Sequence, residues 1–275
     1  MKLILVTTLF ILGASIGSFL SVVLYRVKNN KKGIFLSRSI CTKCNTKIKA
    51  RHLIPIFSYL FLRGKCAYCG SKISKRYFYL ELVTGLLFVV TFLKFNFLIE
   101  ISSSINSDII NYSIDWIVFQ NFAFYTIVNI FFVLIFFYDL LFLEIPDRFS
   151  LTLISIIIAG HLVLNDITAL NMLLGAAGLL SFFLIQYIIS KGKWIGGGDL
   201  RMGIMIGALL GLKFGIVALF ISYVIGALFS IVLILLKKVN RKSKIPFGPF
   251  LIIGTLTVLF YGQELLDFYL SLLKI

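Results

Sequence analysis

The sequence has 275 residues, of which 60% are hydrophobic and only 14% are charged. Soluble domains average about 25% charged residues, so this composition excludes an ordinary soluble enzyme, a disordered chain and a small disulfide scaffold. The charge is lopsided, with 27 Lys and Arg against 11 Asp and Glu, a formal net charge of +16. On a soluble protein this excess would indicate nucleic-acid binding. On a chain this apolar it indicates membrane orientation, and we expect an integral membrane protein with no nucleic-acid partner.

Apolar runs of about 20 residues, long enough to cross a bilayer, recur along the chain. We predict an all-α polytopic membrane protein with about eight transmembrane helices, six or seven being the alternatives. The predicted spans are Leu3–Tyr25, Phe78–Ile99, Trp116–Tyr138, Phe149–Leu164, Ile167–Ile189, Leu200–Leu212, Phe214–Leu236 and Phe250–Leu270. The first span is expected to remain as an anchor, because its basic block follows it and no A-x-A cleavage site is present.

Basic residues orient these spans, since Lys and Arg stay preferentially on the cytoplasmic side. The segment Arg26–Arg76 holds fourteen of them and no Asp or Glu. Placing it inside makes alternate loops cytoplasmic and assigns 23 of the 27 basic residues to that side. The loop Glu100–Asp115 carries acids and no bases, as an outer loop should. Both termini are then expected outside.

All four cysteines fall in this basic segment, as two C-x-x-C pairs separated by 21 residues: Cys41 and Cys44, then Cys66 and Cys69. This spacing is close to that of a four-thiolate zinc knuckle. A segment of about fifty residues builds little core by itself, and a metal would supply the missing folding energy. We therefore predict a small cytoplasmic zinc-knuckle-like domain over residues 28–77. Four reduced structural thiols, or two redox disulfides, are the alternatives, and cytoplasmic placement disfavours the disulfides.

The predicted zinc site is structural, because four thiolates leave no open position for water or substrate. The basic surface of the domain has two interpretations. It enforces topology and contacts anionic membrane lipids, or it also attracts an acidic or amphipathic partner.

Two carboxylates lie at the cytoplasmic edge of predicted spans, where an ionisable residue is a functional candidate. Asp139 ends the third span, and Asp199 follows Gly196, Gly197 and Gly198 at the start of the sixth. Both are expected at the same depth, so helix packing could bring them together. Two close carboxylates share a proton, which suits one to act as general base on water and the other as general acid toward an amide. The three glycines would let a substrate backbone approach.

Glycines also recur at every fourth position, a small-xxx-small pattern for close helix packing in membranes. The pattern is predicted to press the helix that carries Asp199 against a neighbour. It comprises Gly203, Gly207, Gly211 and Gly215, and it recurs at Gly13 and Gly17 in the first span.

Each acidic residue has a purely structural alternative. Asp139 could pair with Arg148 or another base, and Asp199 could cap a helix beginning at Leu200. Asp147 follows Pro146, and its expected structural role is that of an N-cap. His52 and His161 have no metal partner at helical spacing and are expected to be bystanders.

Taken in order, these residues resemble the type IV prepilin peptidases, a family of aspartic membrane proteases with a Gly-x-Gly-Asp motif. The resemblance runs nearly the whole length. The segments that carry it are Gly17–Leu20, Tyr25–Arg26, both C-x-x-C pairs, Ile54–Leu60, Arg63–Lys65, Ile73–Ser74, Arg76–Tyr77, Glu81, Asp139 with Ile145–Asp147, Gly196–Asp199 and Pro246–Phe250.

The resemblance implies an enzyme of the bacterial cytoplasmic membrane that cuts the leader from prepilins or pseudopilins at the cytoplasmic face. It implies that Asp139 and Asp199 are the catalytic pair, within a membrane peptidase domain over residues 78–275 that follows the anchor (1–27) and the cysteine domain. Gly196, Gly197, Gly198, Asp147 and Arg201 would form the active-site loops. Some members also methylate the new N-terminus with S-adenosylmethionine.

The sequence departs from the family at two positions. Ser21 stands where Asn is usual, and Arg201 stands where Lys is usual and keeps the charge. A different class of function is also considered, a non-catalytic zinc-stabilised membrane scaffold for pilus or secretion assembly. A transporter is a distant alternative, because its charges should lie near mid-bilayer.

Overall fold

The computed structural model of the chain describes residues 2–29, 39–41, 43–102, 110–240 and 243–272. It divides into two compact units, Met1–Leu134 and Ile135–Ile275. Six basic residues that entered the orientation argument lie outside the described residues: Lys31, Lys32, Arg38, Arg241, Lys242 and Lys274.

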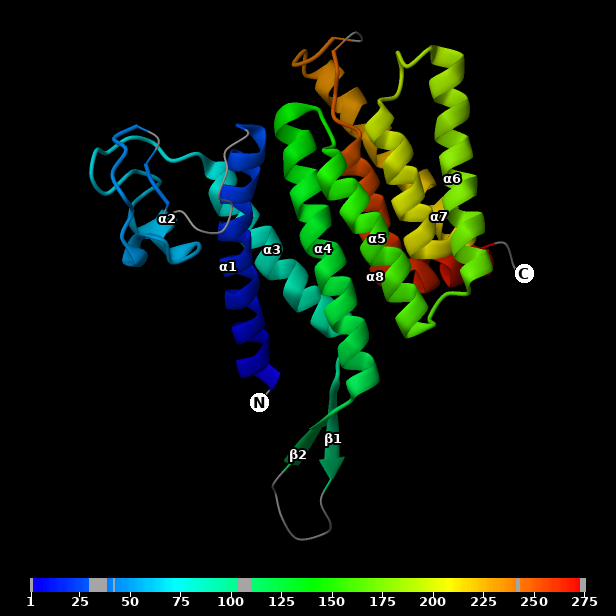
Figure 1. The fold of residues 1–275 in the computed structure, drawn as a ribbon, viewed down its shortest axis with the longest axis horizontal. Helices are drawn as coiled ribbons and strands as arrows, with labels where there is room; N and C mark the ends of the chain where they lie inside the picture. The colour runs from blue at the N-terminus through cyan, green and yellow to red at the C-terminus, as the bar shows by residue number, and fades with distance from the viewer. Residues whose placement is uncertain (1, 30–38, 42, 103–109, 241–242, 273–275) are drawn as a thin grey trace. The chain divides into compact units, whose positions relative to one another are not determined.

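The first unit holds two long helices, most of a third, and several short elements (Figure 1). In chain order these are α1 (Lys2–Lys28), η1 (Ala50–His52), α2 (Phe57–Phe61), α3 (Lys75–Lys94), β1 (Leu98–Ser102), β2 (Ile110–Ile114) and α4 (Trp116–Phe142). The strands β1 and β2 pair antiparallel, with Leu98 opposite Ile114. The predicted second span is therefore too long at its end, because α3 stops at Lys94. The loop predicted over Glu100–Asp115 includes part of β1 and all of β2.

Glycines set the contact between α1 and α3. A Cβ added to Gly17 would lie 2.8 Å from both the Cα of Glu81 and the carbonyl oxygen of Leu80. One added to Gly13 would lie 2.8 Å from the ring of Phe88. Such distances are far below an ordinary contact, so only glycine permits this approach. The close helix packing that the sequence predicts for the first span is confirmed, and its partner is α3.

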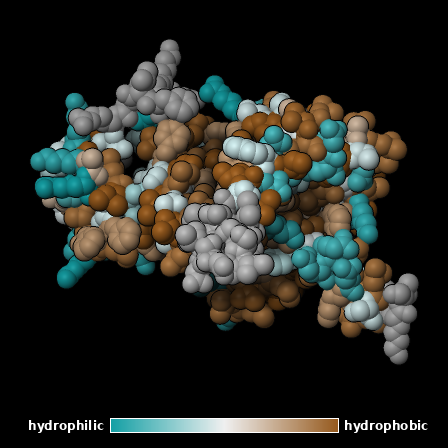
Figure 2. All heavy atoms as spheres, turned by 90° about the horizontal axis from the view of Figure 1, so that it is seen from below, coloured by the Kyte–Doolittle hydropathy of each residue, from teal (hydrophilic) through white to brown (hydrophobic). Residues whose placement is uncertain are grey.

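The second unit contains the end of α4 and four further helices, α5 (Asp147–Leu164), α6 (Ala169–Ser190), α7 (Gly197–Leu235) and α8 (Gly248–Leu272). Over both units, seven helices of the described residues are long and apolar enough to cross a membrane. Large apolar side chains lie on their outer surfaces, such as Ile117 and Val163 at 73% and 76% exposure. Figure 2 shows apolar side chains at the surface of the face in view. The chain is a multi-pass membrane protein.

The helix α7 accounts for the difference between eight predicted spans and seven helices. Its 39 residues would measure about 58 Å if straight, twice the hydrocarbon thickness. It bends at Gly211, whose φ of 71° is left-handed. A Cβ on Gly215 would lie 3.6 Å from the Cα of Gly207, although eight residues span about 12 Å of straight helix. α7 is therefore a helical hairpin, and its arms correspond to the predicted sixth and seventh spans (Figure 1).

The hairpin is fixed by α6. The side-chain oxygen of Asn171 accepts a hydrogen bond from the Leu212 N–H at 3.1 Å, directly after the bend. A Cβ added to Gly207 would lie 2.1 Å from the carbonyl oxygen of Gly175, and a Cβ added to Gly175 would lie 2.2 Å from the carbonyl oxygen of Gly207. Gly203 and Gly207 thus press the first arm of α7 against a neighbour as predicted, and that neighbour is α6. The prediction of one continuous stripe is wrong, because Gly211 makes the bend and Gly215 follows it on the second arm.

Candidate active site and metal centre

The two C-x-x-C pairs form two similar turns in the first unit. The Cys41 N–H donates to Thr46 O and the Asn45 N–H returns to Cys41 O, at 3.0 and 2.9 Å. The second turn repeats this pattern, with the Cys66 N–H on Ser71 O and the Gly70 N–H on Cys66 O, at 2.8 and 2.9 Å. The residue after each pair is left-handed, Asn45 at φ 52° and Gly70 at φ 67°, as Asn and Gly readily allow.

The turns bring all four sulfurs together. The Sγ atoms of Cys41, Cys44, Cys66 and Cys69 lie within 4.8 Å of one another. The Cys41–Cys69 pair is 3.9 Å apart, and all four thiols are free rather than disulfide-bonded. Backbone N–H groups of Cys44 and Lys43 lower the pKa of Cys41 to about 6, which favours the thiolate that a metal requires. This cluster could bind a metal ion, as the spacing predicts.

In the second unit, Asp139 lies near the end of α4 with its carboxylate buried. The residue is 5% exposed, and its Oδ2 accepts a hydrogen bond from the Gly248 N–H at 3.0 Å. Gly248 is the first residue of α8, where backbone N–H groups lack helical partners and favour an anion. A Cβ at Gly248 would lie 2.6 Å from that same oxygen. The alternative in which Asp139 pairs with Arg148 is therefore replaced by this backbone contact.

Asp199 lies in the first turn of α7. The helix begins at Gly197 rather than at the predicted Leu200, so Asp199 is its third residue and not its N-cap. Its Oδ2 accepts a hydrogen bond from the Gly196 N–H at 3.0 Å, the contact that an acidic residue at this position makes in a capping box. Asp199 thus stabilises the helix start, and this role leaves its Oδ1 for other partners.

The three glycines before Asp199 differ from one another. A Cβ at Gly198 would lie 2.9 Å from the Cβ of Ile145, so this position requires glycine for packing. A Cβ at Gly197 would meet nothing within 4 Å, and one at Gly196 would meet only the neighbouring turn. Gly196 and Gly197 are both exposed. They leave open backbone beside Asp199, which is the space that an approaching peptide would need.

The carboxylates of Asp139 and Asp199 lie close enough for their charges to interact. Ile145 lies between the elements that hold them. Its side chain contacts Gly198 beside one aspartate, and its Cδ1 would be 3.4 Å from a Cβ on Gly248 beside the other. Ile145 is 7% exposed. The second unit thus brings together the two aspartates that the sequence places sixty positions apart.

Arg201 and Asp147 join the loop before α5 to the start of α7. The Arg201 guanidinium forms an ion pair with Asp147 through Nη1, and its Nη2 donates to Ile145 O at 3.1 Å. The prediction that Asp147 is an N-cap is wrong, because Pro146 occupies that position and makes no side-chain cap. Asp147 is the first residue of α5 and uses its carboxylate to hold Arg201 instead.

Sequence reasoning missed several residues around this site. Gly248 was recognised only as part of the segment Pro246–Phe250. The sequence does carry a signal for this contact, the pair Gly248-Pro249. Proline suits the first turn of a helix because it has no N–H that needs a partner, and the N–H of the residue before it can then donate to a nearby acceptor. Tyr223 interacts electrostatically with Asp199, and its hydroxyl donates to Gln186 Oε1 at 3.2 Å. Neither Tyr223 nor Gln186 belongs to a motif.

The two histidines lie in separate units. His161 is 2% exposed and its Nδ1 lies 2.6 Å from Asp166 Oδ1. His52 packs edge-on against Tyr68 with ring centroids 5.9 Å apart. Neither belongs to the cysteine cluster that could hold a metal.

Comparison with known proteins places these features in a family. The model of the bacterial peptidase A24 N-terminal domain matches residues 11–95, and that of the type IV leader peptidase family matches residues 126–231. These ranges include the cysteine cluster and both aspartates. No solved structure matches the chain at a significant level.

Three relatives cover nearly the whole chain, and each is named prepilin leader peptidase/N-methyltransferase. The Bacillus subtilis protein is 30% identical over 98% of this chain and 99% of its own length. The Legionella pneumophila protein is 27% identical over 94% and 91%, and the Neisseria gonorrhoeae protein is 30% identical over 89% and 86%. The identity and coverage of these full-length matches show that the chain belongs to the type IV leader peptidase family.

Proposed function

We propose that this protein is an intramembrane aspartic endopeptidase that removes the leader from type IV prepilins or pseudopilins. The observation that carries the proposal is that Asp139 and Asp199 lie within range of each other's charge, beside the exposed backbone of Gly196 and Gly197. Peptide hydrolysis needs a general base for the attacking water and a general acid for the amide nitrogen that leaves. Membership in the leader peptidase family supports the same reaction.

The hydrogen bonds of the aspartates indicate which atoms react. Each carboxylate is held through Oδ2 by a backbone N–H, from Gly248 for Asp139 and from Gly196 for Asp199. The Oδ1 atoms are then the oxygens for water and substrate. One carboxylate takes a proton from water as the oxygen attacks the carbonyl carbon. The other carboxyl gives its proton to the amide nitrogen as the C–N bond breaks, and the products are a free carboxylate and an amine.

The remaining predicted site residues have positioning roles in this proposal. Arg201 ties Asp147 and Ile145 O to the first turn of α7, which fixes Asp199 relative to the end of α4. Gly198 permits the contact with Ile145 that sets this spacing.

The cysteine cluster fits a structural zinc ion in the domain over residues 28–77. Tetrahedral Zn–S bonds of about 2.3 Å place sulfurs about 3.8 Å apart, close to the 3.9 Å between Cys41 and Cys69. Zinc would fix the two turns against each other. Metal analysis of purified, unchelated protein tests this assignment, since less than about half an equivalent of zinc per chain would contradict it.

We further propose that the cysteine domain and both aspartates face the cytoplasm in the bacterial cytoplasmic membrane, with basic loops against anionic lipid. The support is the basic excess at residues 26–76, which would stay inside. The leader of a prepilin substrate would be exposed on the same side of the membrane. The enzyme would also methylate the new N-terminus, the second activity in the names of its relatives.

The experiment is cleavage of a co-expressed prepilin by the full chain carrying Asp139→Asn or Asp199→Asn. Asparagine keeps an oxygen for the Gly248 or Gly196 N–H, so the fold is retained while the acid–base function is lost. We expect a loss of at least about 100-fold with normal membrane accumulation. The control is Asp267→Asn, an exposed aspartate that accepts from Gln263 in α8. Normal cleavage by either test variant would overturn the peptidase assignment and favour a membrane scaffold.

A further inference from the structure

We propose that the hydroxyl of Tyr223, on the second arm of α7, is a third catalytic group that donates a hydrogen bond to the carbonyl oxygen of the amide being cut. The inference deepens the proposed peptidase function and rests on it. When the water oxygen bonds to the carbonyl carbon, an electron pair of the C=O bond moves to the carbonyl oxygen, which becomes negative. In the proposed mechanism neither aspartate donates to this oxygen, although enzymes that cut amides aim preorganised donors at it.

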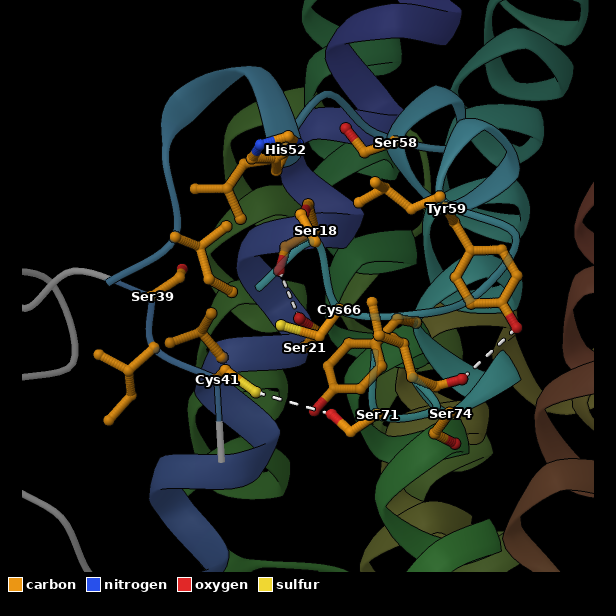
Figure 3. A pocket seen from close by; sticks show the side chains of 18 of the residues that line it. Ser18, Ser21, Ser39, Cys41, His52, Ser58, Tyr59, Cys66, Ser71 and Ser74 are labelled. Carbon is orange, nitrogen blue, oxygen red and sulfur yellow. Dashed lines mark hydrogen bonds between the residues drawn. The ribbon is translucent and has the colours of Figure 1, made fainter. Parts of the chain in front are cut away.

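Hydroxyl groups are present in both units. In the first unit, serine and tyrosine hydroxyls such as those of Ser18 and Tyr59 line a cavity of about 770 Å³, and Glu81 shares that lining (Figure 3). The two aspartates lie in the second unit. There Tyr223 interacts electrostatically with Asp199, so it is the hydroxyl that the structure connects to the proposed chemistry.

The hairpin of α7 sets Tyr223 at the level of Asp199. The bend at Gly211 lies midway between them in the sequence, twelve residues from each. Gly207 and Gly215, each four residues from the bend, lie side by side, because a Cβ on Gly215 would be 3.6 Å from the Cα of Gly207. Both arms rise equally per residue, so positions equally distant from the bend lie at about the same depth. The electrostatic interaction between Tyr223 and Asp199 agrees with this placement.

One stretch of α6 contacts both arms at this level. Phe183 packs on the first arm one turn after Asp199, since a Cβ on Gly203 would lie 2.7 Å from its ring. Gln186, three residues further along α6, accepts the hydrogen bond of the Tyr223 hydroxyl from the second arm, at 3.2 Å. α6 therefore fixes the tyrosine hydroxyl relative to the arm that carries Asp199.

The ring of Tyr223 also packs against the segment that holds the other aspartate. Its centroid lies 4.9 Å from that of Phe247, in an edge-to-face contact. Phe247 directly precedes Gly248, whose N–H donates to Asp139. Tyr223 is half-buried, so its ring is held while its hydroxyl can be reached. One tyrosine thus contacts elements that position both aspartates, as a donor to the shared substrate carbonyl must.

Gln186 is a positioning residue for this hydroxyl. A half-turn of its amide exchanges the oxygen and the nitrogen, so that Nε2 donates to the tyrosine oxygen and the hydroxyl proton is directed to the substrate. The exchange gives up the bond from Nε2 to Phe182 O, which is long at 3.4 Å. As the C–N bond then breaks, the electron pair on the carbonyl oxygen re-forms the C=O bond. The tyrosine keeps its proton throughout.

Steady-state cleavage of a purified prepilin by the full-length protein in lipid nanodiscs tests the assignment. Tyr223→Phe keeps the ring against Phe247 and removes only the hydroxyl. We expect kcat to fall about 100-fold and KM to change less than about threefold, because the bond is made in the transition state. Tyr269→Phe, at an exposed position on α8, is the matched control and should cleave as the unmodified protein does.

Two results with Tyr223→Phe would overturn the proposal. One is a kcat within about threefold of that of the unmodified protein, which would leave the backbone N–H groups at the start of α7 as the donors. The other is a raised KM with unchanged kcat, which would mean that the hydroxyl binds substrate and transition state equally.

Gln186→Leu separates the chemistry of the hydroxyl from the packing of α6. Alone it should lower kcat about tenfold by releasing the hydroxyl. Added to Tyr223→Phe it should cause no further loss, because both changes act through one group. Unchanged cleavage by Gln186→Leu, or losses that multiply in the double variant, would overturn the role given to Gln186. Full cleavage by Tyr223→Phe alongside inactive Asp139→Asn and Asp199→Asn would refute this inference and leave the peptidase assignment intact, whereas normal cleavage by the aspartate variants would refute that assignment.

Discussion

Replacing Gly175 by alanine tests how α6 and α7 are held together. The added Cβ would lie 2.2 Å from Gly207 O and 2.7 Å from the carbonyl carbon of Gly211. A relaxed C···O contact is about 3.3 Å, so the helices must separate by about 1 Å. Both obstructing atoms belong to the backbone, and no rotamer change relieves them. Overpacking of this kind costs about 1–3 kcal/mol, more than the roughly 1 kcal/mol that alanine gains over glycine in a helix.

The same displacement should reach the active site, because the first arm of α7 carries Asp199. A misplacement of about 1 Å lowers catalysis about 100-fold. We therefore expect Gly175→Ala to lower both the thermal unfolding midpoint in detergent and the rate of leader cleavage. Gly178→Ala is the matched control one turn along α6, since its Cβ meets only the flexible end of Leu212 at 2.8 Å. An unfolding midpoint at or above that of the unmodified protein, with full cleavage, would refute backbone contact as the basis of this packing.

Four smaller predictions follow from other contacts. Gly198→Ala should slow leader cleavage tenfold or more by pushing against Ile145, while Gly197→Ala should leave protein accumulation and unfolding unchanged, because its Cβ meets nothing. Asn171→Ala should lower the free energy of unfolding by about 1 kcal/mol, measured in detergent, because the Leu212 N–H loses its acceptor. Arg201→Lys should keep most cleavage, whereas Arg201→Gln should lose about tenfold, because only lysine preserves the ion pair. Cys41→Ser should lower bound zinc in metal analysis and increase proteolysis at residues 28–77, and normal zinc content would contradict a four-thiolate site.

Composition and periodicity were sufficient for the membrane architecture, because the cost of polar groups in lipid forces long apolar runs. They were also sufficient for the long helices, including the two arms of α7, but not for the short helices η1 and α2. The predicted spans already broke the chain at Lys213, but the role of Gly211 in the bend was not foreseen, since Gly211 also belongs to a helical stripe of glycines. Only the tertiary contact with Asn171 distinguishes a glycine that turns the chain from one that packs. The strands at Leu98 and Ile110 were missed because short apolar runs do not distinguish strand from helix.

The cysteine cluster was predictable because its four cysteines form two C-x-x-C pairs, and this local spacing is typical of a metal-binding turn. The aspartates were harder, since only their equal depth suggested that they meet. Their partners were harder still to predict. Asp139 is held by a backbone N–H, which every non-proline residue possesses, so only the Gly-Pro pair at the start of α8 marks Gly248 as a candidate donor. Similarly, Ile145 is an ordinary apolar residue whose position between Gly198 and Gly248 arises only when α4, α7 and α8 are packed.

Glu81 and Asp139 follow the same physical rule in the two units. Each is a carboxylate at a helix position where lipid would penalise it, and each is stabilised by a backbone N–H from another segment. In the second unit a second carboxylate lies nearby, and the acid–base chemistry that we propose depends on this pair. In the first unit Glu81 is the one carboxylate among the described residues that line the cavity, and five basic side chains share that lining: Arg26, Lys43, Lys47, Lys72 and Arg76. Without a second carboxylate, Glu81 lacks the acid–base partner that the proposed hydrolysis requires.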